Sequence, residues 1–113
     1  AYNHTSKIAD NYNIIKNSII PSLEKSNTNI MLLKQISNDF TFAILASEND
    51  FLNSPKQHNQ KIIQNLRTIQ KLTKLDLSKY IKNYKHYFNY TLSITKKLIN
   101  SDTQTQHQEE INS

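Results

Sequence analysis

The chain has 113 residues, a formal net charge of +5 at pH 7, 36% hydrophobic residues, and neither cysteine nor glycine. The length is usual for one domain, and the missing cysteine excludes disulfide frameworks and cysteine-based zinc sites. The missing glycine excludes a Gly-rich phosphate loop and argues against sheets and hairpins, whose turns usually need it. The longest apolar runs, such as residues 42–46, are far shorter than the roughly 20 residues of a membrane span.

The charge is unevenly distributed along the chain. Residues 1–53 carry four lysines and five carboxylates, a net −1. Residues 54–100 carry nine lysines and Arg67 against Asp76 alone, a net +9, and residues 101–113 carry −3. The middle part could therefore attract an anion, an acidic partner or lipid headgroups, although a solvated lysine face is the simpler interpretation.

The first segment predicts one long helix, because its apolar and small residues recur every three or four positions and share one face. This stripe consists of Ile8, Tyr12, Ile15, Ile19, Ser22, Ser26, Ile30, Leu33, Ser37, Phe40, Ile44 and Ser47. Pro21 interrupts it, because proline removes a backbone hydrogen bond and clashes with the preceding turn. We expect either one long helix kinked near Ile19 to Pro21 or two stacked helices with a break there.

A second helix is predicted after the turn-forming residues 47–53. Ser54 can cap it, Pro55 suits the first helical position, and Gln57 can complete a capping box. Its apolar positions are Ile62, Ile63, Leu66, Ile69 and Leu72.

A third helix, capped by Asp76 or Ser78, is expected to run to about Asn100. On a helical wheel its apolar positions form one face, namely Leu77, Ile81, Tyr84, Phe88, Leu92 and Thr95, and the opposite face carries Lys79, Lys82, His86, Asn89, Ser93 and Lys96. The stretch SKYIKNYKHYFNY mixes rings and cations in sequence, as nucleic-acid surfaces do. The wheel separates them, which favours an ordinary amphipathic helix over a nucleic-acid surface.

These elements predict an all-α protein, an antiparallel helical bundle with one long kinked N-terminal helix and two shorter helices. Residues 1–100 would form the domain, and residues 101–113 a polar tail that is frayed or begins a further element. Three unequal helices bury themselves poorly in so small a chain. A homodimer, with the long helix as its seam, would complete a four-helix-type bundle.

Catalytic chemistry is not indicated. The histidines at 4, 58, 86 and 107 show no zinc-like spacing, and no Ser–His–Asp arrangement is signalled. We therefore expect a non-enzyme without metal or cofactor. Arg67, the only arginine, is the best candidate for gripping a carboxylate, nitrate or phosphate-like anion through its fixed fork of donors. Tyr84 and Tyr87 are candidate pocket walls beside it. The simpler interpretation is a surface ion pair for the arginine, because exposed arginines are the rule, and buried tyrosines whose hydroxyls reach the bundle edge need no ligand.

From about Ile19 to Ile99 the chain resembles the helical extracytoplasmic sensor domains of bacterial chemoreceptors, sensor histidine kinases and diguanylate cyclases. The resemblance rests on the stretches IIPSLEKSNTNIMLLKQISNDFTFAILASENDFL, NQKIIQNLRTIQKL and YIKNYKHYFNYTLSITKKLI. It implies a periplasmic module, often dimeric, held between two membrane spans outside this chain, which passes a ligand- or partner-driven shift to a cytoplasmic output domain. Many such sensors return to the membrane through a further long helix, whereas this sequence ends in a polar tail, so we expect either a compact version of the domain or a truncated chain.

Two functional hypotheses follow from the sequence. The first is a sensor domain that responds to a small anionic ligand or a periplasmic partner protein. The alternative is a basic helical binding protein for nucleic acid or an acidic surface polymer, suggested by the +9 of residues 54–100.

Overall fold

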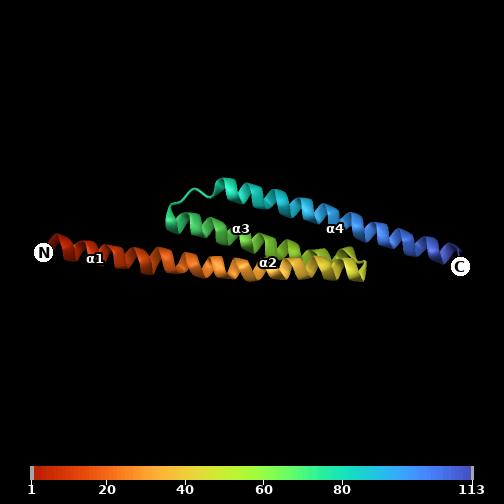
Figure 1. The fold of residues 1–113 in the computed structure, drawn as a ribbon, viewed down its shortest axis with the longest axis horizontal. Helices are drawn as coiled ribbons and strands as arrows, with labels where there is room; N and C mark the ends of the chain where they lie inside the picture. Colours follow the sequence, from red (N-terminus) through yellow and green to blue (C-terminus); the bar gives the residue numbers. More distant parts are fainter. Residues whose placement is uncertain (1, 113) are drawn as a thin grey trace.

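The computed structural model describes the backbone of residues 2–112 and the side chains of residues 6–101 and 107–112. Over this range the chain is all-α, as predicted. Its elements are α1 (Tyr2–Ile14), a π-helix (Ile15–Ile19), α2 (Ile20–Ala46), a 3₁₀-helix (Asn49–Leu52), α3 (Asn53–Thr73) and α4 (Ser78–Asn112). The helices run up, down and up in an elongated layer with extents of 87 × 21 × 13 Å, in which the free end of α1 and that of α4 point in opposite directions (Figure 1).

The N-terminal helix is continuous, so the single long helix is the correct one of the two predicted alternatives. A π-helix precedes Pro21, and the N–H of Ile20 donates to the carbonyl of Ile15, five residues back. The wider turn accommodates a proline that can neither donate nor tolerate the carbonyl four residues earlier. The Ser22 hydroxyl donates to the Ser18 carbonyl over 2.6 Å, which satisfies a backbone acceptor beside the proline.

The turn between α2 and α3 lies where the sequence predicts it, but the predicted capping box is wrong. Ser47 ends α2 in the left-handed region (φ 53°), the position that glycine usually fills. The 3₁₀-helix then leads straight into α3, and the Asn53 N–H donates to the Asp50 carbonyl. Because this turn already satisfies α3's first donors, the Ser54 hydroxyl is free to donate to the Asp39 carboxylate instead, over 3.2 Å.

The helices α2 and α3 form an antiparallel seam with a seven-residue repeat. Its buried positions are Ser22, Asn29, Ile36 and Ala43 on α2 and Pro55, Ile62 and Ile69 on α3. This spacing is typical of coiled-coil packing. The predicted stripe contains only two of α2's buried residues, Ser22 and Phe40, because the face packed on α3 is rotated away from it.

An amide pair lies inside this seam, which the sequence analysis missed. The Asn65 side-chain N–H donates to the Asn29 side-chain carbonyl over 2.9 Å, and Asn29 donates onward to the Ile62 backbone carbonyl. Both residues are at least 93% buried. Two amides that satisfy each other avoid the cost of a buried polar group without a partner.

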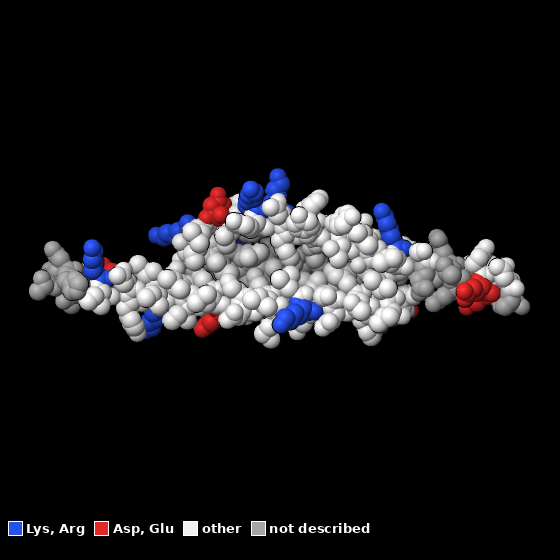
Figure 2. Space-filling view, viewed as in Figure 1, with Lys and Arg blue, Asp and Glu red and all other residues white. Residues whose placement is uncertain are grey.

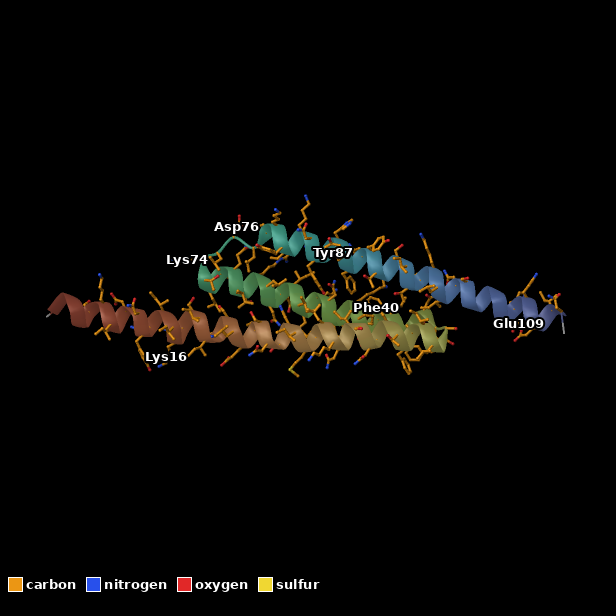
Figure 3. All side chains as sticks on the ribbon, in the orientation of Figure 1. Lys16, Phe40, Lys74, Asp76, Tyr87 and Glu109 are labelled. Carbon is orange, nitrogen blue, oxygen red and sulfur yellow. The ribbon has the colours of Figure 1, made fainter. Side chains whose placement is uncertain are left out.

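Helix α4 begins with the predicted Asp76 cap, and its inner face is the predicted one. The Asp76 carboxylate accepts from the Ser78 N–H over 3.0 Å, at the turn that Figure 3 marks with Lys74 and Asp76. Ile81, Phe88 and Thr95 are buried as expected. The helix continues to Asn112 rather than ending near Asn100, because the polar residues after it include good helix formers such as glutamine and glutamate.

Candidate functional site

Helix α4 borders two cavities, one shared with α3 and the other shared with α2. The cavity between α3 and α4, the basic cleft, has a volume of about 520 Å³ and is lined by Arg67, Gln70, Lys71, Ser78, Ile81, Lys82 and Lys85. The cavity between α2 and α4, the apolar groove, has a volume of about 550 Å³ and contains no charged residue in its lining. The two cavities therefore offer opposite chemistry.

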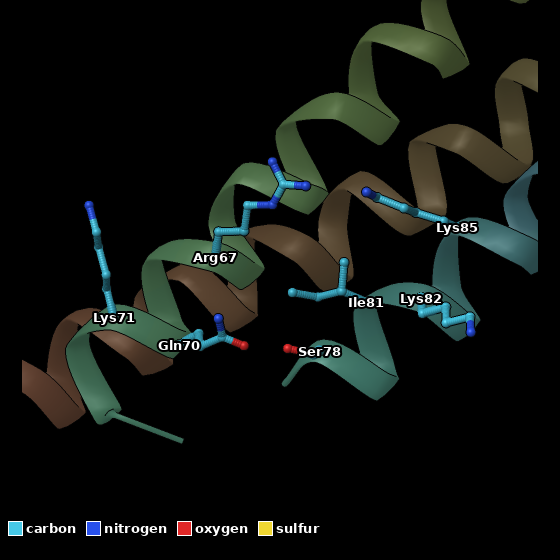
Figure 4. A pocket seen from close by; sticks show the side chains of 7 residues that line it. All are labelled: Arg67, Gln70, Lys71, Ser78, Ile81, Lys82 and Lys85. Carbon is cyan, nitrogen blue, oxygen red and sulfur yellow. The ribbon is translucent and has the colours of Figure 1, made fainter. Parts of the chain in front are cut away.

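The centre of the basic cleft is formed by Arg67 of α3 and Lys85 of α4. Figure 4 shows their charged ends reaching into the same space from the two helices, while Lys71 and Lys82 point outward at the rim. Lys85 is half-buried because it flanks Ile81, whose side chain forms the floor of the cleft. Arg67 is exposed and Lys85 half-buried, so the two cations share the solvent-open space between the helices.

No carboxylate neutralises these cations among the side chains that the structure describes. The ion pair found there joins His58 and Asp39, 2.8 Å apart, on the α2–α3 hairpin. The predicted surface ion pair of Arg67 is not formed with any described residue. Two like charges facing each other without a counter-charge create a positive potential, which an anion would relieve.

A hydrogen bond fixes the mouth of the basic cleft. The Leu77 N–H, just before α4, donates to the side-chain carbonyl of Gln70 on α3 over 2.8 Å. The connecting turn needs Lys74 in the left-handed region, with φ 58°. The start of α4 is therefore attached to α3 beside the cleft.

The apolar groove is lined by side chains of α2 and α4. They are Leu33, Ile36, Ser37, Phe40, Thr41 and Ile44 on α2, and Tyr84, Tyr87, Phe88, Thr91, Ile94, Thr95 and Leu98 on α4. The rings of Phe40 and Phe88 meet at its floor, 5.8 Å apart, and Figure 3 shows Tyr87 on the α4 wall. Tyr87 is 68% exposed and Leu98 49%, so the groove is open and unfilled.

Tyr84 brings a buried polar group to the lining of the apolar groove. Its hydroxyl is buried and has no hydrogen-bond partner among the described residues. Burial disfavours the phenolate and raises the pKa of Tyr84 to about 12. A buried hydroxyl without a partner costs free energy, so this side chain lowers the stability of the fold around the groove.

The structure separates the three site residues that the sequence analysis grouped together. Arg67 lines the basic cleft, whereas Tyr84 and Tyr87 line the apolar groove on the other side of α4. Sequence reasoning missed Lys85, which lies four residues after Ile81 and therefore beside the buried face. It also missed Lys71, four residues after Arg67; both spacings were available as signals.

Among the described side chains there is no group of three or more histidine or carboxylate residues that could hold a metal ion. His58 pairs with Asp39, His86 contacts the ring of Tyr87, and His4 lies outside the described side chains. None of the helices, over the part of the chain described, carries an apolar stretch long enough to cross a bilayer. Comparison with protein-family models, curated proteins and solved structures finds no match in any of the three.

Proposed function

We propose that this chain is a helical sensing module whose basic cleft binds a small anionic ligand, a carboxylate or a phosphate. The observation that carries the proposal is that Arg67 of α3 and Lys85 of α4 face each other in one cleft without a described counter-charge. The resemblance noted in the sequence supplies the wider setting, the extracytoplasmic part of a bacterial membrane receptor. The module acts by binding rather than by catalysis.

Arg67 and Lys85 would each bind the anion in a different way. The guanidinium of Arg67 presents a planar fork that matches two oxygens of a carboxylate or phosphate, while the Lys85 ammonium contributes a point charge from the other helix. Gln70 and Ser78 add polar groups at the mouth. A ligand held in this way bridges α3 and α4.

Bridging two helices gives binding a mechanical consequence. Without a ligand, like charges push α4 away from α3 at the cleft, and a bound anion reverses that force. Helix α4 is hydrogen-bonded at its start to α3, through Leu77 and Gln70, and at Asn100 to Asn49 of the 3₁₀-helix. Only its last part, after the buried Ile99, extends past the end of α2 (Figure 1). A small shift of α4 against α3, the kind of motion that helical receptors use, would therefore displace its distal end.

In a receptor held by two membrane spans, both ends of the sensor domain must lead to the same membrane. The free ends of α1 and α4 lie at opposite ends of the layer (Figure 1), so a polypeptide that returned to the same membrane would need a further antiparallel helix. The sensor domains that this chain resembles often have such a helix. The flanking gene sequence decides this point, and a gene without hydrophobic spans on either side would contradict the receptor setting.

Calorimetric titration with inorganic phosphate and a panel of small dicarboxylates tests the binding step. We expect at least one to bind with 1:1 stoichiometry per chain, and Arg67→Gln/Lys85→Gln to weaken it by about 100-fold or more, because each of the two charged hydrogen bonds contributes about 1.5–3 kcal/mol. The matched control is Lys96→Gln/Lys97→Gln, which removes two exposed cations of α4 outside the cleft.

The alternative, a basic protein that binds acidic polymers, predicts a different outcome. On the face that Figure 2 shows, the Lys and Arg side chains lie in separate places with uncharged surface between them, so this face carries no continuous track for a polyanion. Tight binding of a polyanion with a steep salt slope, weakened equally by the cleft and the control variants, would overturn the cleft proposal.

A further inference from the structure

We propose that the apolar groove is a docking site for the N-terminal arm (residues 6–19) of a second copy of this chain. Two copies would exchange arms about a two-fold axis, each arm filling the groove of the other copy. This inference concerns a different face of α4 from the basic cleft and does not depend on anion binding.

The apolar groove has the form of a helical bundle that lacks one helix. Helices α2 and α4 run in the same direction, and α3 runs against both on one side of them (Figure 1). A four-helix bundle of alternating direction therefore needs one more helix in the groove, antiparallel to α2 and α4. The exposed walls of the groove, including Leu33, Ile94 and Leu98, are suited to an apolar helix face.

The arm is a helix whose apolar residues stay largely exposed in its own chain. Over the described residues helix α1 contacts no element except the π-helix that follows it, whereas the π-helix at the end of the arm packs against α3, where Ser18 donates a hydrogen bond to the Leu72 carbonyl. Ile8 is 58% exposed and Tyr12 62%, with Ile15 and Ile19 also exposed. The arm continues the packed helix α2, so it is already helical, and burying its apolar face in a partner would add stability.

The arm and the groove match in length and direction. From Ile8 to Ile19 the arm spans about 17 Å at 1.5 Å per residue, as does the α2 wall from Leu33 to Ile44. In an antiparallel dimer whose two α2 helices cross at Ser26, the arm of one copy lies along this wall of the other, with Ile19 opposite Leu33. The arm then runs antiparallel to α2 and α4 of the other copy, which is the direction that a four-helix bundle requires.

The electrostatics and size of the contact favour a second copy over a charged partner. The chain carries +5 overall, but the groove lining contains no charged residue, so two copies meet there without repulsion between lysines. Thirteen residues line the groove, and one face of the arm adds about six, which approaches the 20–30 residues per side of a standard interface. Because the dimer is two-fold symmetric, each copy contributes both its groove and its arm, and the arm-in-groove contact is formed twice per dimer.

Sedimentation equilibrium over a range of protein concentrations tests the proposal, without added ligand. We expect a monomer–dimer equilibrium, and Ile8→Asp/Tyr12→Asp should raise the dissociation constant on the order of 100-fold, because an unpaired carboxylate would be buried in the groove. Ile8 and Tyr12 lie in α1, which packs on neither α3 nor α4 among the described residues, so this variant should keep the helicity and melting of the α2–α3–α4 layer. Ser6→Asp/Asn13→Asp adds the same charge to exposed arm positions outside the apolar stripe and should dimerise like the unmodified protein.

Disulfide cross-linking tests the direction of the exchange, because the chain has no cysteine of its own. A mixture of Ile15→Cys and Ser37→Cys chains should form a mixed disulfide dimer under mild oxidation, while neither variant alone should cross-link. Self-linked Ser37→Cys dimers would indicate a parallel pair and overturn the proposal. A protein that stays monomeric at high concentration, or a dimer that the arm variant does not weaken, would overturn it as well.

Discussion

Helix α2 carries two interfaces side by side, the seam with α3 and the groove with α4. They differ in how fully their apolar side chains are buried. The seam is closed by a tight hairpin, and its residues reach full burial, as at Ala43 and Ile62. The groove is built from equally apolar side chains, yet Leu33 stays 47% exposed. Its Tyr84 hydroxyl also lacks a partner among the described residues. The contrast shows that an apolar helix face is buried only where the topology supplies a partner.

The two sides also use polar residues differently. In the seam, Asn29 and Asn65 bond to each other, so these two amides are satisfied within the chain. At the groove and the basic cleft, a hydroxyl and two facing cations lack such partners. The closed side of α2 is therefore structural, and the open sides of α4 are the places at which binding can change the molecule.

The largest expected effect comes from removing a buried seam residue. Ile62→Ala, at a side chain that is 2% exposed, should lower the free energy of unfolding by about 2–5 kcal/mol, because it leaves a cavity that the helices cannot fill. Ile94→Ala, on the groove wall, should cost less than half as much at concentrations where the protein is monomeric. Urea unfolding measures both, and equal costs would contradict the distinction between closed seam and open groove.

The amide pair gives a second, smaller test of the seam. Asn29→Ala or Asn65→Ala should each cost about 1–3 kcal/mol, because each leaves a buried amide unsatisfied. The double variant Asn29→Leu/Asn65→Leu should cost less than the sum of the single changes, since no polar group then remains buried there. A double-mutant cycle in urea checks this, and strict additivity would show that the two amides do not interact.

A third test concerns Tyr84 and alkaline pH. Its pKa lies at about 12 in the fold against 10.0 in the unfolded chain, so between these values the folded state binds more protons. The stabilisation from the neutral phenol is therefore complete below pH 10 and is lost as pH rises toward 12. Urea unfolding across this range should show a steeper fall for the unmodified protein than for Tyr84→Phe, and identical slopes would contradict a buried hydroxyl.

The smallest effect is expected at the start of α4. Hydrogen bonds from Ser78 hold the pKa of Asp76 below its usual value, so the ionised cap contributes stability above the ordinary carboxyl pKa and loses it as pH falls below that value. Asp76→Asn should remove most of this acid dependence while keeping the cap, because asparagine also caps helices well. Thermal melts at neutral and acidic pH compare the two, and unchanged acid dependence in the variant would contradict the assignment.

The predictions from sequence succeeded where local chemistry was sufficient. The three-to-four residue spacing predicted a long N-terminal helix, with Pro21 leaving open a kink or a break, and the wheel placed Ile81, Phe88 and Thr95 inward. They failed where a neighbour decided the outcome. Ser54 bonds to Asp39 rather than capping α3, and Arg67 and Tyr84 enter different cavities because α4 separates them.

The sequence by itself determined that the chain is helical, where its turns lie and which face of α4 is apolar. These follow from glycine-free composition, side-chain periodicity and capping residues, which act within a few residues of one another. Only the tertiary structure decided which of α2's apolar positions are covered, that Asn29 meets Asn65, and that Arg67 and Lys85 converge. The physical reason is that burial and charge are shared between helices: a single helix can offer two apolar faces, and the hairpin geometry selects the one that α3 closes.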